Sequence, residues 1–225
     1  TNTLNVPLVA DAVIEWSLKQ NPEIGIRTGT VNPVVGEVND GFLNDIQGRH
    51  VRKEHVFQAL ENAHSGPVEE GAVGAGTGSS CMGWKGGIGT ASRVLPLELG
   101  GYTVGVLVQT NFDGVLTVGG APVGRELGRY SFSKYFPYSL PEPQDPGGSV
   151  MVVVATDAPL DQRQLERVAK RVGLGLARTG FYSSNGSGDF FIAFSTAQRI
   201  PHTSGLTIKS EVVSKTPCPP SFWLP

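Results

Sequence analysis

The sequence predicts a protein of the mixed α/β class, and two patterns support that prediction. Apolar residues recur at helical spacing in three segments, residues 8–19, 51–64 and 161–178. Short runs of β-branched and apolar residues bounded by turn-forming residues predict buried strands, above all at 150–155 and 190–194. With 225 residues, of which 39% are hydrophobic, the chain can bury one substantial core.

Each predicted helix has one apolar face. In the first, LVADAVIEWSLK, Asn21-Pro22 stops the pattern, because proline cannot continue a helix. The helix at 161–178 is the most clearly amphipathic. The apolar positions that define the three faces are Val9, Val13 and Trp16; Val56, Leu60 and Ala63; and Leu165, Val168, Ala169, Val172 and Leu176.

Three further segments are defined by glycine or proline. Residues 71–92 predict a glycine-rich loop, and YTVGVLVQTNFDGVLTVGG predicts two strands joined by a turn at Asp113-Gly114. Four prolines make residues 131–148 an extended linker, which predicts a boundary between a portion 1–148 and a portion 149–225. The stretch from 197 to 225 loses periodicity, and we expect it to be poorly ordered.

Composition excludes several classes of function. The formal net charge of −2 argues against a nucleic-acid or anionic-membrane surface, and the apolar runs are too short to span a bilayer. Cys81 and Cys218 are too few for a disulfide framework, so we expect a reducing compartment and a cytoplasmic location. The chain begins TNT without methionine, and we expect a mature end or a fragment.

Phosphate and metal chemistry are both poorly supported. GAGTGSS has neither the lysine spacing of a P-loop nor G-x-G-x-x-G, so a packing loop is favoured and Lys85 is interpreted as a solvated charge. The histidines, including His50 and His55, are scattered, and surface or capping roles are favoured. We therefore expect neither a metal nor a cofactor.

Ser149 is the candidate nucleophile. No G-x-S-x-G elbow is present, which disfavours a Ser-His-Asp hydrolase. Ser149 instead begins a predicted buried strand, directly after Gly148. If the Gly148–Ser149 bond were cut, the freed α-amine could act as general base for the serine's own hydroxyl, and that hydroxyl could also make the cut. The alternative is a purely structural role, in which a turn is followed by a buried strand.

Many long motifs in collinear order, from Thr1 to about Val213, resemble the DmpA/BapA family of N-terminal-nucleophile aminopeptidases. That resemblance implies an αββα sandwich, self-cleavage into α and β chains at Gly148–Ser149, and a homo-oligomer acting on peptides, amides or esters with a free amino terminus. The motifs are DAVIEW, LNDI, GRHV, GPVEEG, GAGTG, KGGIGTASR, GGYTVGVLVQ, GGSVMVVVATDAPL, LARTG and NGSGDFFIAFSTA.

The resemblance also implies roles for individual residues. Ser149 matches the nucleophile, Ser187 a serine that hydrogen-bonds it, and Asp189 the acid that orients this second serine. Asn111 matches an oxyanion-hole amide and Glu37 the carboxylate that binds the substrate ammonium. Without the resemblance, Asn111 is better interpreted as a turn former, Glu37 as a solvated charge, and Ser187 and Asp189 as loop residues.

The sequence departs from the family pattern in three places. Asn39 stands where some members have an oxyanion-binding tyrosine. The family's N-terminal segment precedes the point where this chain begins, and SKTPCPPSFWLP diverges at the other end, so we expect truncation at both ends and an incomplete sandwich. The alternative hypothesis is therefore a catalytically silent, truncated relative that binds a ligand or partner without turnover.

Overall fold

The computed structural model describes residues 1–130, 133–135, 148–201 and 205–214, so most of the predicted linker and the end of the chain lie outside the described residues. The helices and strands follow in chain order. They are α1 (Val6–Gln20), α2 (Lys53–Glu61), β1 (Ser80–Cys81), β2 (Trp84–Lys85), β3 (Gly87–Val94), β4 (Thr103–Asn111), α3 (Val123–Glu126), β5 (Ser149–Thr156), α4 (Gln162–Ala177) and β6 (Gly188–Ser195).

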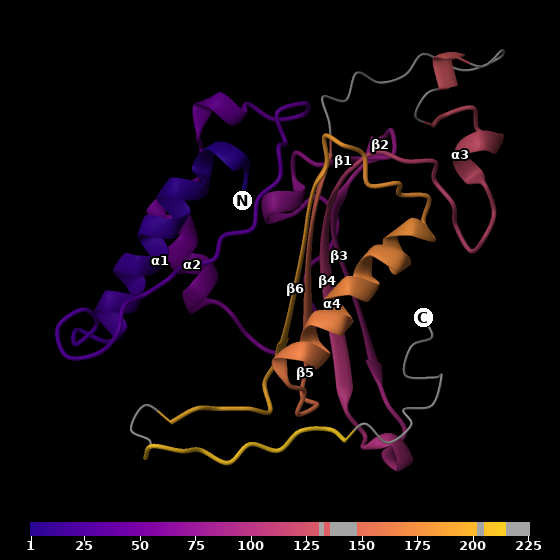
Figure 1. Cartoon of the computed structure of the whole chain (residues 1–225). Helices are drawn as coiled ribbons and strands as arrows, with labels where there is room; N and C mark the ends of the chain where they lie inside the picture. The colour runs from indigo at the N-terminus through magenta and orange to yellow at the C-terminus, as the bar shows by residue number, and fades with distance from the viewer. Residues whose placement is uncertain (131–132, 136–147, 202–204, 215–225) are drawn as a thin grey trace.

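The principal sheet has four strands in the order β3-β4-β5-β6 (Figure 1). Pairing is antiparallel from β3 to β5 and parallel between β5 and β6. Helix α4 supplies the crossover that two parallel strands require. It also covers one face of the sheet, so the described residues build one helix layer and one principal sheet of a layered α/β fold.

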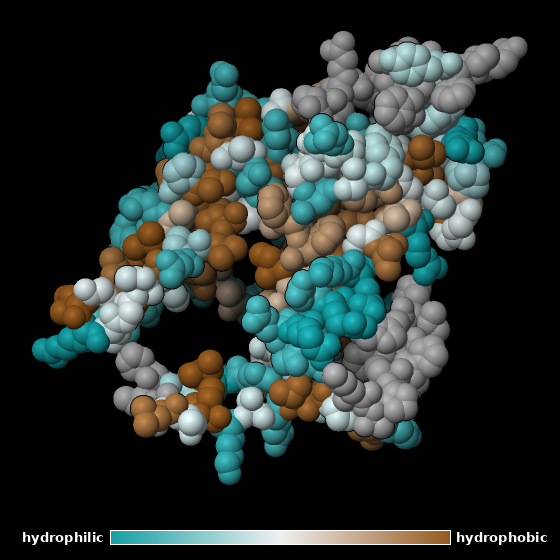
Figure 2. Space-filling view, in the orientation of Figure 1, coloured by the Kyte–Doolittle hydropathy of each residue, from teal (hydrophilic) through white to brown (hydrophobic). Residues whose placement is uncertain are grey.

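The core lies between this sheet and α4. Val150, Val152 and Val154 alternate along β5 toward the helix and are almost fully buried. Leu176 and Phe181 close the core near the end of the helix. Figure 2 shows hydrophilic residues over the outward surface of α4, as the amphipathic pattern predicts.

The predicted helices and strands are largely confirmed. Helix α4 begins with a capping box, in which the Asp161 carboxylate accepts from Gln164 N at 2.7 Å and Gln164 Oε1 accepts from Asp161 N at 2.8 Å. In the described part of the chain, no helix is both long and apolar enough to cross a membrane. Residues 197–201 and 205–214 form neither helix nor strand.

Two predictions about loops were wrong. Residues 71–92 are not all loop, because 87–94 form β3. The second strand of the expected hairpin, after Asp113-Gly114, does not pair with β4, because β3 and β5 already occupy both sides of that strand. The chain leaves the sheet instead, and Val115 N donates to Gly180 O at 3.0 Å, beside the end of α4.

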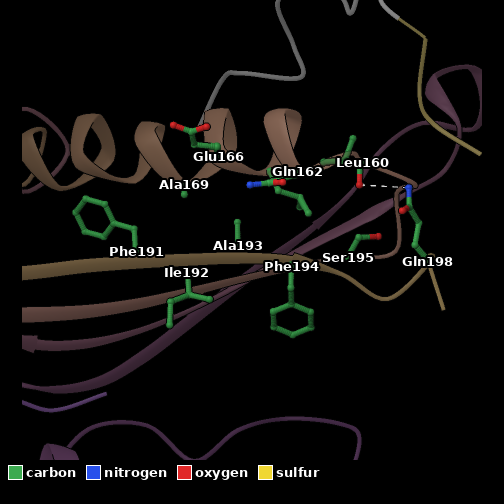
Figure 3. Close-up of a pocket in the computed structure, with 11 residues that line it drawn as sticks. Leu160, Gln162, Glu166, Ala169, Phe191, Ile192, Ala193, Phe194, Ser195 and Gln198 are labelled. Atoms are coloured by element: carbon green, nitrogen blue, oxygen red, sulfur yellow. Dashed lines mark hydrogen bonds between the residues drawn. The ribbon is translucent and has the colours of Figure 1, made fainter. Parts of the chain in front are cut away.

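A pocket lies between α4 and the later part of β6 (Figure 3). Ala169, Phe191 and Ala193 face one another across it, whereas Ile192 and Phe194 point away from α4. Phe190 lies on that second face as well, by strand alternation, and is 57% exposed. The sheet therefore has one covered face and, along β6, one apolar face open to solvent.

Candidate active site

Ser149 is the first residue of β5, an inner strand of the sheet, and is 8% exposed. Its register partners are Asn111 on β4 and Gly188 on β6. Residues directly opposite each other in an antiparallel pair project to the same face. Asn111 and Ser149 therefore stand side by side, on the face opposite α4.

The Asn111 side chain is held in one orientation by two backbone groups. Its Oδ1 accepts from Ser80 N at 3.0 Å, and its Nδ2 donates to Asn39 O at 2.8 Å. Asn111 is the buried last residue of β4, so it does not act as a turn former. An amide nitrogen carries two hydrogens, so Asn111 Nδ2 can donate one further hydrogen bond next to Ser149.

Ser187 and Asp189 form a second pair at the start of β6. The Ser187 hydroxyl donates to Asp189 Oδ1 at 2.6 Å, a length typical of a charge-assisted bond. Asp189 is the register partner of Val150, so alternation directs it toward the α4 face and away from the Ser149 hydroxyl. The Ser187 hydroxyl donates its hydrogen to Asp189. The described residues therefore do not show the hydrogen bond from Ser187 to Ser149 that the resemblance implies.

Gly148 packs closely against the backbone at the end of β4. A Cβ there would stand 2.8 Å from Phe112 Cα, closer than side-chain carbons approach backbone. The backbone of Gly148 does not adopt a left-handed conformation, so close packing rather than conformational freedom explains the glycine. Its carbonyl, the group that self-cleavage would attack, accepts from Gly188 N at 3.0 Å.

The segment containing Glu37 and Asn39 comes from the N-terminal part of the chain. It passes over β5, since a Cβ on Gly36 would lie 2.9 Å from Met151 Cε, and Met151 shares the face of Ser149. The Glu37 carboxylate accepts a hydrogen bond from the Thr3 hydroxyl. Asn39 reaches the site through its carbonyl, while its exposed side chain accepts from Gly41 N at 3.1 Å.

Within the described ranges, no group of three histidine, cysteine or acidic side chains could hold a metal ion. His55 caps α2, accepting from Arg52 N at 3.1 Å, and His50 lies 2.9 Å from Asp45, where its hydrogen bond lowers the pKa of the Asp45 carboxyl. Both are structural roles, as the sequence predicts.

Lys85 is exposed, as expected of a solvated charge, but its ammonium also holds two backbone carbonyls. Its ammonium donates to Gly76 O at 2.8 Å and to Gly86 O at 2.7 Å, and desolvation lowers its pKa. The lysine therefore links two parts of the glycine-rich segment. A Cβ on Gly76 or Gly87 would lie within 2.6 Å of Gly71 O, so these glycines permit close backbone packing.

Sequence reasoning missed one side chain at the site. The Ser183 hydroxyl donates to Asp189 Oδ2 at 2.6 Å, so the carboxylate accepts from two serines. A serine next to another serine in a polar loop gives no signal by itself. The positive φ of 50° at Ser183, which a sequence does not reveal, marks the position.

Comparison with known proteins identifies the chain's relatives. The model of peptidase family S58 matches residues 1–220. Over 213 residues the chain is 49% identical to a β-peptidyl aminopeptidase, BapA, of Sphingosinicella microcystinivorans; the match covers 88% of this chain and 50% of that protein. The chain thus spans about half the length of the curated relatives it matches.

Solved structures agree with this result. A protein of Pyrococcus horikoshii OT3 superposes with a TM-score of 0.82 at 48% identity, covering 95% of this chain and 56% of that one. The L-aminopeptidase D-Ala-esterase/amidase of Ochrobactrum anthropi, a variant of the Ntn hydrolase fold, superposes with a TM-score of 0.79 at 37% identity, covering 95% and 57%.

The likeness to these solved structures thus places the molecule in the class of Ntn-type hydrolase folds. More narrowly, the chain belongs to peptidase family S58. The resemblance found in the sequence is confirmed, and so is the fold class that it implied.

Proposed function

We propose that the chain is the catalytic part of a serine aminopeptidase that first cuts itself between Gly148 and Ser149. The observation that supports this most directly is the register of β4 and β5, which sets the fixed Asn111 amide beside Ser149. Family membership supports the reaction class, since relatives are named aminopeptidases. The proposed substrates are small peptides, amides or esters with a free amino terminus.

Self-cleavage would begin when Ser149 Oγ attacks the Gly148 carbonyl carbon. The C–N bond breaks, the peptide nitrogen takes a proton and becomes the α-amine of Ser149, and Gly148 is left as an ester on Oγ. The Gly148 carbonyl is already polarised by its hydrogen bond from Gly188 N. Water then hydrolyses the ester, which frees the Gly148 carboxylate and the hydroxyl.

Turnover would reuse the same hydroxyl. Ser149 Oγ attacks the substrate carbonyl, the freed α-amine takes the hydroxyl proton and passes it to the leaving amine, and water hydrolyses the acyl-enzyme. The Asn111 amide donates to the oxyanion in both steps, a contribution of about 3–4 kcal/mol for one such donor. Glu37, in the segment over Met151, pairs with the substrate ammonium.

Ser187 and Asp189 would orient the new amine. In the uncut chain Gly188 N is bonded to Gly148 O, and Ser187 donates to Asp189. Cleavage removes Gly148 from that bond and releases the start of β6. The Ser187 side chain can then turn toward the amine while it keeps its hydrogen bond to Asp189.

Assembly and location complete the proposal. We propose a homo-oligomer of processed α/β units in the cytoplasm, because the family resemblance implies such units and the two cysteines suit a reducing compartment. The exposed side chains of Phe190, Ile192 and Phe194 leave apolar surface for further packing.

Intact-mass spectrometry under denaturing conditions tests the proposal. The wild-type protein should give two masses that meet at Gly148–Ser149, whereas Ser149→Ala should give one mass and lose at least about a thousandfold in turnover. Ser195→Ala is the control, because Ser195 lies at the opposite end of β6, where its hydroxyl donates to Ala158 O at 2.6 Å and accepts from Ala197 N at 3.1 Å. Turnover that persists in purified S149A protein refutes the assignment, and a single wild-type mass favours the silent relative.

A further inference from the structure

The loop before β6 is closed on itself by one carboxylate. Ser187 N donates to Ser184 O at 2.9 Å, which makes residues 184–187 a tight turn. Ser183 precedes this turn and Ser187 is its last residue, and both hydroxyls donate to Asp189 at 2.6 Å. The two oxygens of Asp189 are thus each occupied by one end of the loop.

Ser183 reaches Asp189 from a backbone conformation that L-residues rarely adopt. Its φ is 50°, and the other described residues apart from glycine with positive φ are Arg49 and Met82. A side chain in this region is strained, and such strain persists only where the surroundings hold the residue in place. Glycine would fit here without strain, so the serine is explained by what its hydroxyl does.

The hydroxyl fixes which way the carboxylate faces. A carboxylate held at one oxygen can still rotate about its Cβ–Cγ bond, whereas one held at both oxygens cannot. Hydrogen bonds to a charged acceptor are about twice as strong as neutral ones, so the 2.6 Å contact holds even at an exposed position. The orientation of Asp189 then determines where Ser187 lies.

We propose that Ser183 is a positioning residue for the reaction: by binding Asp189 Oδ2 it keeps Oδ1 directed at Ser187. The inference rests on the proposed function, in which Ser187 and Asp189 orient the α-amine of Ser149. Ser183 itself touches neither substrate nor nucleophile, so its loss should lower the rate of the chemical step and leave substrate binding unchanged.

Two substitutions separate the hydroxyl from the backbone strain. Ser183→Gly removes the hydroxyl and relieves the strain, whereas Ser183→Thr keeps the hydroxyl and adds a β-branched side chain to a left-handed position. A structural role predicts that S183T is the worse protein in every respect. A positioning role predicts that S183T is less stable than S183G but has the higher kcat.

The measurements are kcat, KM, the rate of self-cleavage and the thermal midpoint of the purified protein. For S183G we expect kcat to fall about tenfold with KM, the cleavage rate and the midpoint unchanged, because the α-amine that Ser187 and Asp189 orient exists only after cleavage. For S183T we expect kcat within about twofold of wild type and a midpoint lower by about 3–6 °C. Ser184→Ala, which alters the neighbouring side chain, should change neither kcat nor the thermal midpoint.

The outcomes separate this inference from the proposed function. If wild type and S149A are equally inactive, the proposed function fails and the role of Ser183 fails with it. If wild type is active and S183G matches its kcat, Ser183 has no positioning role while the proposed function stands. A rise in KM in S183G without loss of kcat also overturns the inference.

Discussion

The sheet and the N-terminal part of the chain, residues 1–61, hold the proposed site residues by different means. Ser149, Asn111 and Asp189 lie on three neighbouring strands, where continuous ladders fix their register. Glu37 and Asn39 lie in a segment outside regular secondary structure. An isolated bridge and a few hydrogen bonds attach it, among them those to Thr1, Thr3 and Asn111. Helices α1 and α2 stand apart from the sheet in Figure 1.

The two regions also differ in how they are stabilised. The sheet buries Val150 and Val152 on β5 completely, whereas in α1 and α2 the buried residues are Ala12 and Val56. Ion pairs join the helices instead, with Lys53 Nζ 2.6 Å from Asp11 and 2.8 Å from Glu15. Burial stabilises far more than exposed ion pairs do, so the residues proposed to react lie on the more strongly stabilised region and the residue proposed to bind the substrate ammonium lies on the weaker one.

The largest effect should come from the core beneath the nucleophile. Phe112 is 2% exposed and packs edge-on against Phe181, with ring centroids 4.7 Å apart. We expect Phe112→Ala to cost about 3–5 kcal/mol in urea unfolding, because it leaves a cavity under Gly148. Phe57→Ala, in the half-buried surface of α2, should cost clearly less. Equal losses would contradict the contrast between the regions.

Next comes the amide beside Ser149. Asn111→Ala should lower kcat about 100- to 1000-fold, because an oxyanion donor is lost. Gln109→Ala is the matched control: Gln109 lies two residues away on the same face, and its amide donates to Ala75 O at 3.1 Å. If both variants lose activity equally, the effect is structural and Asn111 has no special role.

A smaller effect is expected in the segment over β5. Glu37→Gln removes the charge but can still accept from Thr3, and we expect KM for substrates with a free amino terminus to rise about tenfold. Initial rates over a range of substrate concentrations measure this. Glu23→Gln, at a surface pair with Arg27, is the control. An unchanged KM in E37Q would remove Glu37 from substrate recognition.

The smallest effect belongs to the ion pairs of α1 and α2. Hydrogen bonds from Lys19 and Lys53 lower the pKa of Glu15 to about 2. A carboxyl group whose pKa is lowered in the folded state stabilises that state at pH values above the ordinary carboxyl pKa. This stabilisation disappears as the pH falls toward 2. The thermal midpoint of Glu15→Gln should be slightly below wild type near neutral pH and equal to it near pH 2, with less difference in high salt. A difference that persists in acid would contradict this.

Local patterns in the sequence determined the helices and inner strands. The proline after Asn21, the capping residues at 161–164 and the β-branched run of β5 act over a few residues, so they could be interpreted without the fold. The long motifs determined the family in the same way. The nucleophile could be proposed because a serine after glycine at the start of a buried strand is a local feature.

Only the tertiary structure decided how these elements meet. That β4 lies between β3 and β5, and so has no free side for a hairpin, depends on pairings between distant segments. The same pairings set Asn111 beside Ser149, direct Asp189 to the other face and require glycine at 148 against Phe112. The conformation of Ser183 and its bond to Asp189 were equally invisible in the sequence, because strand register and backbone dihedral angles follow from packing across the whole sheet.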